Sequence, residues 1–391
     1  MKAITLTPAH ARSRLVAPED MVSCSVAFID CKLPGSNLKQ NYYFIGSGVT
    51  QSSSQVVNIP EPHGFNIGAV AMPKGVTYNL HLHFTAEVFL IHEGTWRFRW
   101  GANGEHEADF NPPAILTIPT WIFRGFTNVS KEDTCGMVYT VQGGNNTGGI
   151  IWHPSILKAA SEYGMFLSED NMLIDVNAGD TLPDKSGLFT PLAIEEIAAL
   201  RYYSVEDMRK RAVTGVARCW SSEGLLDSIL PGHGGEIAPV IGYGISQDRH
   251  STPPITQPHG FSVEWLLLQA EHQVGRHLCP DIQVIMVFKG VLEVTWNQEG
   301  EEVSIIAEEC SVVSIPAHSW RRYRAVEGGT EFVLTTQGDQ RKHVYWDETI
   351  LQQVREHNRS LDPDGYVCKL DILPINARHA SMRIESLPVE K

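Results

Sequence analysis

Long apolar runs are missing from this sequence. No stretch of its 391 residues approaches the roughly 20 consecutive apolar residues of a membrane-spanning helix. The segment Met1–Asp20 holds Arg12 and Arg14, and it lacks the apolar run that forms the core of a signal peptide. We therefore expect a cytoplasmic protein with no membrane partner.

Closely spaced cysteine pairs are missing as well. The chain has seven cysteines, an odd number, and they are widely spaced without a Cys-x-x-Cys pair. Such spacing indicates neither a disulfide framework nor a structural zinc site. We expect these thiols to be reduced and mostly buried.

Positive charge is in deficit. Lys and Arg together number 31 against 45 Asp and Glu, which gives a formal net charge of -14. Nucleic acids and anionic membranes both require a basic surface on their partner. The sequence therefore predicts no nucleic-acid partner and favours a small-molecule substrate.

The sequence contains an internal repeat. Pro62-His63-Gly64-Phe65 recurs as Pro258-His259-Gly260-Phe261, 196 positions later, and His81 recurs as His277 at the same offset. Other matches keep the offset between 194 and 197, among them Gln142-Gly143 with Gln337-Gly338. A chain of this length can hold two domains, so we interpret it as a tandem duplication.

Each copy consists of short segments rich in β-branched and aromatic residues, broken by Gly, Pro and Asn turns, which is typical of an antiparallel sandwich or barrel. A short helix is predicted to close each copy, at about 154–162 and 347–357. Between the copies, Thr190-Pro191 and the capping box Ser204–Asp207 predict two helices.

The resulting division has five parts. A strand is also expected near Leu370–Leu373. The parts are an N-terminal tail (1–22), a first barrel with a candidate metal site (23–163), a helical connector (164–215), a second barrel (216–358) and a C-terminal tail (359–391).

The strongest functional signal is His81-x-His83-x3-Glu87. Two histidines two positions apart on a strand share one face, and a carboxylate four residues later returns to that face after a tight bend. Two imidazoles and one carboxylate are the donors of a facial triad, which leaves positions on a metal open. The sequence therefore predicts a metal site at His81, His83 and Glu87.

With its flanking glycines, Gly75 and Gly94, this motif resembles the first signature of the cupin superfamily. The resemblance covers both copies and implies an all-β bicupin, with two tandem double-stranded β-helix (jelly-roll) barrels. At the second signature, Pro119 and Asn128 are in register, but Arg124 stands where the superfamily has its last histidine ligand.

Pro119-x-Trp121-x-Phe123 is similar to the gentisate and hydroxynaphthoate dioxygenases, which are bicupins of similar length. Those enzymes use three histidines and usually lack the glutamate, so the resemblance to them is partial. Arg124 cannot ligate a metal, because its guanidinium stays protonated. It either clamps the carboxylate or enolate of a substrate or pairs with Glu87 and weakens the metal site.

The second copy keeps only part of the motif. His277 is retained, whereas Cys279 and Gln283 replace the second histidine and the glutamate, and Arg321 repeats Arg124. Loss of the carboxylate removes the charge that would hold a hard cation. We expect a degenerate site in a barrel that supports the first copy or a dimer interface.

Aromatic residues near the motif are candidates for a substrate pocket. Phe89, Trp121 and Phe123 would suit a planar substrate, although any barrel core also needs such residues. The Gln142 amide is a candidate ligand contact, and satisfying loop backbone is its alternative task.

From the resemblance we expect a mononuclear non-haem dioxygenase acting on a small aromatic or enolisable carboxylate. His81, His83 and Glu87 would hold Fe(II), with Mn, Ni or Zn as other possible metals, and Arg124 would anchor the anionic substrate. The alternative is a non-redox metabolite- or sugar-binding cupin, or a scaffold or regulatory bicupin with an empty site. A homodimer is also expected.

Overall fold

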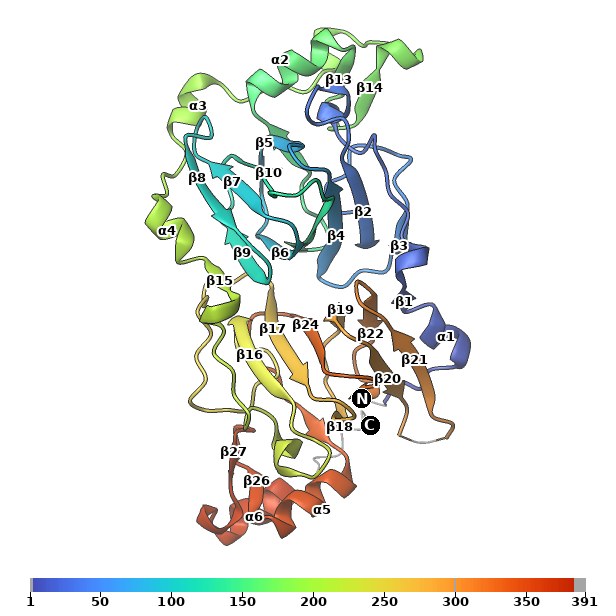
Figure 1. The fold of residues 1–391 in the computed structure, drawn as a ribbon, viewed down its shortest axis with the longest axis vertical. Helices are drawn as coiled ribbons and strands as arrows, with labels where there is room; N and C mark the ends of the chain where they lie inside the picture. Colours follow the sequence, from blue (N-terminus) through green and yellow to red (C-terminus); the bar gives the residue numbers. More distant parts are fainter. Residues whose placement is uncertain (1–2, 299, 383–391) are drawn as a thin grey trace. The chain divides into compact units, whose positions relative to one another are not determined.

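The computed structural model describes residues 3–298 and 300–382, which form two compact units (Figure 1). We call residues 21–217 barrel 1, and residues 1–20 together with 218–391 barrel 2. Each unit contains two large β-sheets. The prediction of two β-barrels from a duplicated sequence is confirmed.

Barrel 1 has a seven-stranded and a five-stranded sheet, in the orders β15-β9-β6-β11-β4-β2-β3 and β12-β5-β10-β7-β8. The first contains β2 (Gln40–Ile45), β3 (Val57–Ile59), β4 (Phe65–Met72), β6 (Glu87–Glu93), β9 (Ala114–Ile118), β11 (Gly136–Gly143) and β15 (Ala212–Thr214). The second contains β5 (Thr77–His83), β7 (Trp96–Trp100), β8 (His106–Phe110), β10 (Arg124–Asn128) and β12 (Ile150–Trp152).

Strand β7 shows how the sequence fills barrel 1. Trp96, Phe98 and Trp100 are fully buried, whereas Arg97 and Arg99 between them are partly exposed. This alternation places every second side chain in the interior, as the strand geometry requires. The interior rings pack edge to face and stacked, so aromatic burial supplies much of the hydrophobic stabilisation of this barrel.

Barrel 2 repeats this plan with a six-stranded and a five-stranded sheet, in the orders β1-β22-β19-β24-β17-β16 and β21-β20-β23-β18-β25. The first contains β1 (Leu15–Val16), β16 (Glu236–Ile241), β17 (Phe261–Leu268), β19 (Gln283–Lys289), β22 (Val312–Ile315) and β24 (Thr330–Gln337). The second contains β18 (Gln273–Leu278), β20 (Leu292–Trp296), β21 (Val303–Ala307), β23 (Trp320–Ala325) and β25 (Tyr345–Trp346).

The helices predicted to close the copies are present as α2 (Pro154–Glu162) and α5 (Glu348–Glu356). Pro154 occupies the first turn of α2, and the Asp347 side chain caps α5 by accepting a hydrogen bond from the Thr349 amide at 2.9 Å. These are the positions that a helix start favours for proline and for an acidic residue. Both predictions are confirmed.

The connector contains less helix than expected. The two helices are short, α3 (Ile194–Ala198) and α4 (Val205–Arg209), and a hairpin of β13 (Met165–Leu167) and β14 (Leu173–Asp175) precedes them. Ser204 caps α4 as its capping box predicts. Helix α4 ends at Arg209 because residues 212–214 form strand β15, which pairs with β9 of barrel 1.

Residues 3–20, which were expected to be part of a tail, pack as part of barrel 2. Leu15 and Val16 form β1, which pairs with β22 of barrel 2, and helix α1 (Pro8–Arg12) precedes it. The equivalent strand of barrel 1, β9, is paired by β15 in the same way. In each barrel one edge of the larger sheet, at β9 or at β22, is therefore covered by the segment that precedes the other repeat, which satisfies the backbone groups of that edge.

The C-terminal part also has structure. It forms β26 (Arg359–Leu361), β27 (Val367–Lys369) and α6 (Ile375–Met382). Residues Leu370–Ile372, where we predicted a strand, form a 3-10 turn, and the strand lies just before them. Residues 383–391 lie outside the described part. Other 3-10 turns lie at Pro18–Asp20, Ile29–Lys32, Val176–Ala178, Lys185–Gly187, Gly215–Ala217 and Leu226–Ile229.

The sequence predicts reduced, mostly buried cysteines and no membrane-spanning segment. Four cysteines are buried, Cys310 is half-buried, Cys135 and Cys219 are exposed, and none of these seven described residues forms a disulfide. Among the described residues, no helix combines the length and the apolar character that crossing a lipid bilayer would require.

Candidate metal centre

The two motif histidines lie on one face of β5. His81 pairs with Arg124 of β10 on one side and with Trp152 of β12 on the other. The His81 and His83 ring centroids are 4.9 Å apart, and both side chains are buried. The alternation of a regular strand therefore brings the imidazoles together, as the sequence predicts.

His81 is held in one tautomer. Its Nδ1 donates a hydrogen bond to the Asn79 carbonyl at 2.6 Å, which leaves the lone pair on Nε2. The Asn79 side chain donates in turn to the Asp30 carboxylate at 3.0 Å. Burial, followed by the neighbouring His83, lowers the pKa of His81 well below its ordinary value. His81 is therefore a neutral imidazole with a free donor nitrogen.

Glu87 reaches the same place from the other sheet. It is the first residue of β6 and lies opposite Gln142 of β11. Its Oε1 accepts a hydrogen bond from Gln142 Nε2 at 3.2 Å and lies 3.4 Å from His83 Nε2. Burial alone would raise its pKa, but His83, Arg124 and His81 outweigh that effect and hold the pKa of Glu87 at about 2. The carboxylate is therefore ionised.

Arg124 is the first residue of β10 and is fully buried. Its Nη2 donates to the Pro119 carbonyl at 2.7 Å, and its Nε lies 3.8 Å from Glu87 Oε2. Neither Nε nor Nη1 makes a hydrogen bond to any residue that the structure describes. Burial lowers the pKa of Arg124 to about 10, partly opposed by Glu87. The guanidinium therefore stays charged at neutral pH.

The three motif side chains fit a divalent metal. His81, His83 and Glu87 each offer one ligand atom, and these atoms lie within 4.8 Å of one another. Glu87 Oε2 is buried without a hydrogen bond to any described residue, so it has a lone pair to give. A donor set of two imidazoles and one carboxylate suits Fe, Mn, Ni or Zn.

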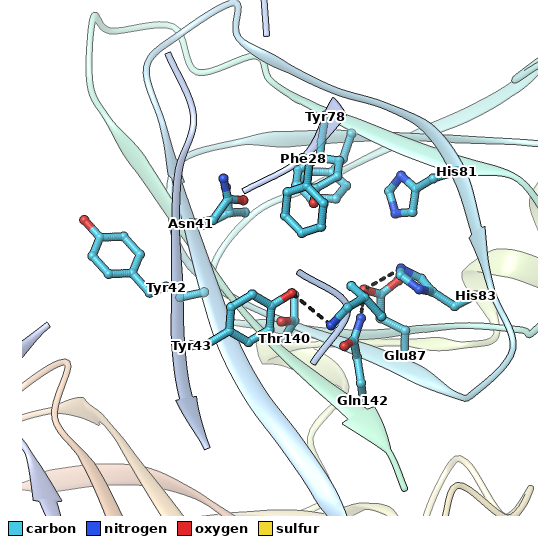
Figure 2. Close-up of a pocket in the computed structure, with 14 residues that line it drawn as sticks. Phe28, Asn41, Tyr42, Tyr43, Tyr78, His81, His83, Glu87, Thr140 and Gln142 are labelled. Carbon is cyan, nitrogen blue, oxygen red and sulfur yellow. Dashed lines mark hydrogen bonds and ion pairs between the residues drawn. The ribbon is translucent and has the colours of Figure 1, made fainter. Parts of the chain in front are cut away.

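A cavity of about 30 Å³ adjoins these donors (Figure 2). About 15 Å³ measured in this way accommodates one water molecule, so the cavity has room for about two. His81, His83, Glu87 and Gln142 supply polar atoms to its lining, and Tyr43 lies opposite them. In this conformation the space suits a carboxylate group and is too small for an aromatic ring.

The three aromatic residues that were predicted to line a substrate pocket do not line this cavity. Phe89 packs in the core against Phe98, Phe123 is buried beside His153, and Trp121 is 46% exposed. These three therefore lie away from the lining of the cavity, whereas Gln142 forms part of it. Phe89 is inward-facing like Glu87, but it lies two positions further along β6, where the core closes.

Sequence reasoning missed several lining residues, and a β-bulge explains one of them. Between the pairs Arg124↔His81 and Phe126↔Tyr78, strand β5 has one residue more than β10. The extra residue changes the side-chain alternation, so Tyr78 faces the cavity together with His81. The other missed lining residues are Phe28, Asn41, Tyr42, Tyr43, Val49, Ala69, Val70, Phe126 and Thr140.

The second copy has the same framework without the donor set. His277 Nδ1 donates to the Gly275 carbonyl at 2.8 Å, as His81 does to Asn79. Burial raises the pKa of the Cys279 thiol to about 11, so the thiolate that a metal requires is disfavoured. Among the described residues, no third His, Cys, Asp or Glu joins these two in a metal-binding group.

Gln283 and Arg321 make protein contacts in that barrel. Gln283 Nε2 donates to the Thr336 hydroxyl at 3.1 Å. Arg321 donates to the Pro316 carbonyl at 2.9 Å and to the Cys279 carbonyl at 3.3 Å. Arg321 therefore donates through both Nη atoms to protein carbonyls, whereas Arg124 donates through Nη2 alone among the described residues.

No protein-family model matches the sequence, and a search of curated proteins finds no match. Solved structures do match in fold. Oxalate decarboxylase from Lactobacillus farciminis, in complex with formate, has a TM-score of 0.54 at 11% identity, with 91% of this chain and 95% of that chain covered. Oxalate decarboxylase from Bacillus subtilis, which has Mn(II) centres, has a TM-score of 0.52 at 10% identity, with 88% of this chain and 83% of that chain covered.

Proposed function

On the premise that this chain has the fold of a bicupin, we propose that barrel 1 is a mononuclear metalloenzyme that cleaves a small carboxylate in an oxygen-dependent reaction. One observation carries the proposal. His81, His83 and Glu87 converge in a buried space beside a charged arginine whose Nε and Nη1 make no hydrogen bond to the described residues.

Each residue has a distinct task in this proposal. His81, His83 and Glu87 hold a divalent cation, for which Fe(II) is our first choice and Mn(II) the next. When bound, the metal supplies Lewis acidity and redox chemistry. Arg124 binds the negative charge of the substrate. Gln142 fixes the orientation of the Glu87 carboxylate through its hydrogen bond at 3.2 Å.

The size of the cavity narrows the substrate. Space for about two water molecules favours a short-chain, enolisable carboxylate over the aromatic substrates of the ring-cleaving dioxygenases. The low-dielectric lining also strengthens the attraction between Arg124 and an anionic group. We therefore propose that the substrate is a small aliphatic carboxylate.

A second candidate reaction is decarboxylation without net oxygen consumption. It is favoured by the names of the structural neighbours, which are oxalate decarboxylases. A third possibility is a non-catalytic role. It is favoured by the distance of 3.8 Å between Arg124 and Glu87, because an arginine that neutralises the carboxylate weakens its attraction for a metal.

Metal analysis and gas exchange separate these functions. We expect about one Fe or Mn per purified wild-type chain, and much less in Glu87→Gln, because glutamine removes the anionic donor. Oxygen uptake on addition of short-chain carboxylates supports the oxygenase, and CO₂ release without uptake supports the decarboxylase. Cys279→Ser in barrel 2 is the matched control and should keep the wild-type metal content. A wild-type chain that binds none of these metals after reconstitution would contradict both enzymatic proposals.

A further inference from the structure

The site in barrel 1 has an uneven charge balance. The Glu87 carboxylate and the Arg124 guanidinium carry opposite charges and lie 3.8 Å apart, so this pair sums to zero without a metal. Asp30, which is linked to His81 through Asn79, forms a buried ion pair with Lys39 at 2.5 Å, so these two charges cancel each other. A divalent cation would therefore leave about two uncompensated positive charges in a buried place, which is costly in a low dielectric.

The hydrogen-bonding groups have a matching imbalance. Arg124 is fully buried, and of its three guanidinium nitrogens only Nη2 makes a hydrogen bond to the described residues. Glu87 Oε2, 3.8 Å from Arg124 Nε, also lacks a hydrogen bond within that part of the chain. Buried charged donors without partners are costly, so an acceptor beside Arg124 would be stabilising.

We propose that barrel 1 binds its metal and a carboxylate anion cooperatively, with Arg124 as the anchor of the anion at the position where the sequence pattern otherwise calls for a histidine ligand. The anion supplies both the negative charge and the hydrogen-bond acceptors that the metal-bound site lacks. This inference rests on the metal site of the proposed function, and it adds that metal affinity depends on the anion.

The linkage must be reciprocal. If the anion increases the affinity for the metal by some factor, the metal increases the affinity for the anion by the same factor. Coupling between adjacent sites is typically 5- to 150-fold, and we expect about tenfold or more here, because the charges are buried. Without the anion, Arg124 opposes the cation directly, and it is near enough to Glu87 to compete for it.

Barrel 2 offers a matched control for the arginine. Arg321 is buried like Arg124 and lies opposite His277 as Arg124 lies opposite His81. Two of its nitrogens donate to protein carbonyls, and the acidic position beside it is Gln283. Replacing Arg321 therefore removes the same buried charge from the chain without touching the metal donors.

The experiment is a titration of the full-length, metal-stripped chain with Mn(II), followed by the EPR signal of free Mn(II). It is done in formate and in chloride at the same ionic strength, and a protein-free titration corrects for complexes between Mn(II) and formate. In the wild type we expect about tenfold tighter Mn(II) binding in formate. Calorimetry should show that Mn(II) tightens the binding of formate by the same factor.

Three variants complete the design. In Arg124→Gln, Mn(II) binding should no longer depend on formate and should be at least as tight in chloride as in the wild type. Arg124→Lys keeps the charge but loses the planar fork, so it should retain a smaller linkage. Arg321→Gln should keep the full wild-type linkage.

Two failures have different meanings. Equal Mn(II) affinity in formate and chloride for the wild type would overturn the inference and leave the metal site standing. No Mn(II) binding in either salt would overturn the proposed function as well. Should Arg124→Gln not fold, the reciprocal calorimetry on the wild type alone still decides between these results.

Discussion

The two barrels share a backbone plan and differ at the positions that decide chemistry. Glu87 lies opposite Gln142 in barrel 1, and Gln283 lies opposite Thr336 in barrel 2. In both barrels an amide donates a hydrogen bond across the two strands, to a carboxylate in one and to a hydroxyl in the other. Both barrels therefore have a hydrogen bond at this place, whereas the ionised carboxylate is found only in barrel 1.

The two arginines show the same contrast. Arg124 and Arg321 both donate to the carbonyl of a proline five residues earlier in the chain. Arg321 also donates to the Cys279 carbonyl, whereas Arg124 has the Glu87 carboxylate at 3.8 Å. The same side chain is thus a structural bridge in barrel 2 and a charged neighbour of a candidate metal site in barrel 1.

The largest effect is expected from giving barrel 1 the residues of barrel 2. The double variant His83→Cys and Glu87→Gln removes one imidazole and the only carboxylate of the donor set. Loss of groups that merely support ligands costs 10- to 100-fold in affinity, so loss of two donors should weaken metal binding by more than about 100-fold. Dialysis against Mn(II) with elemental analysis measures the effect, and near wild-type metal content would show that other residues hold the ion.

The reverse exchange should give barrel 2 a metal site. Cys279→His and Gln283→Glu would provide a second imidazole and a carboxylate next to His277, which is already held by the Gly275 carbonyl. We expect the metal content to rise from about one to about two per chain at saturating Mn(II), with weaker binding at the new site, because the new ligands would lack neighbouring groups that orient them. Unchanged stoichiometry in a folded variant would show that the two backbones are less alike than their strand registers indicate.

The sequence predicted the duplication and the metal motif, because both depend on spacing. His81 and His83 lie on one face of β5, as their spacing predicts. Asp347 caps α5, as the local preference of a helix start for an acidic residue predicts. The sequence alignment paired Gln142 with Gln337, but the strand registers make Thr336 its equivalent, and Gln337 is exposed. A shift of one residue decides which side chain faces the site, and spacing alone cannot show such a shift.

The pairing of strands that are distant in the chain could not be predicted from the sequence. The bulge that turns Tyr78 toward the cavity exists only in relation to β10. Likewise, β1 forms because β22 offers it an edge, and its two residues, Leu15 and Val16, are too few to give a strand signal of their own. Features that depend on a partner strand therefore had to come from the structure.

The two barrels stabilise one turn, at Val49 in barrel 1 and at Ile245 in barrel 2, with different side chains. The Ile245 amide donates to the Glu264 carboxyl at 3.1 Å, and the equivalent Val49 amide donates to the Tyr43 hydroxyl at 3.3 Å. Burial, opposed by Ile245 and Lys342, raises the pKa of Glu264 from 4.5 to about 8. Barrel 2 therefore contains an acid that the folded state keeps protonated at neutral pH.

The sign of the resulting pH dependence follows from proton binding. Between about pH 4.5 and pH 8 the folded state keeps a proton that the unfolded state releases, so Glu264 lowers the free energy of unfolding by up to about 1.4 kcal/mol for each pH unit gained. Its stabilising contribution is complete below pH 4.5 and is lost by pH 8. In Glu264→Gln this slope should disappear, which denaturant titrations at pH 5.5, 7 and 8.5 would measure. Parallel pH profiles for the variant and the wild type would contradict the buried, protonated acid.

The smallest effect is expected from the same turn in barrel 1. Tyr43→Phe removes the hydroxyl that accepts the Val49 amide hydrogen bond but keeps the ring, which fits because Gly68 opposite has no side chain. A single buried hydrogen bond contributes about 1 kcal/mol to stability, and its loss should not depend on pH below 9, since burial keeps the pKa of Tyr43 above its usual range. The same denaturant titrations test this expectation. A pH-dependent loss in this variant would mean that an ionisable group, and not a neutral hydroxyl, holds the turn in barrel 1.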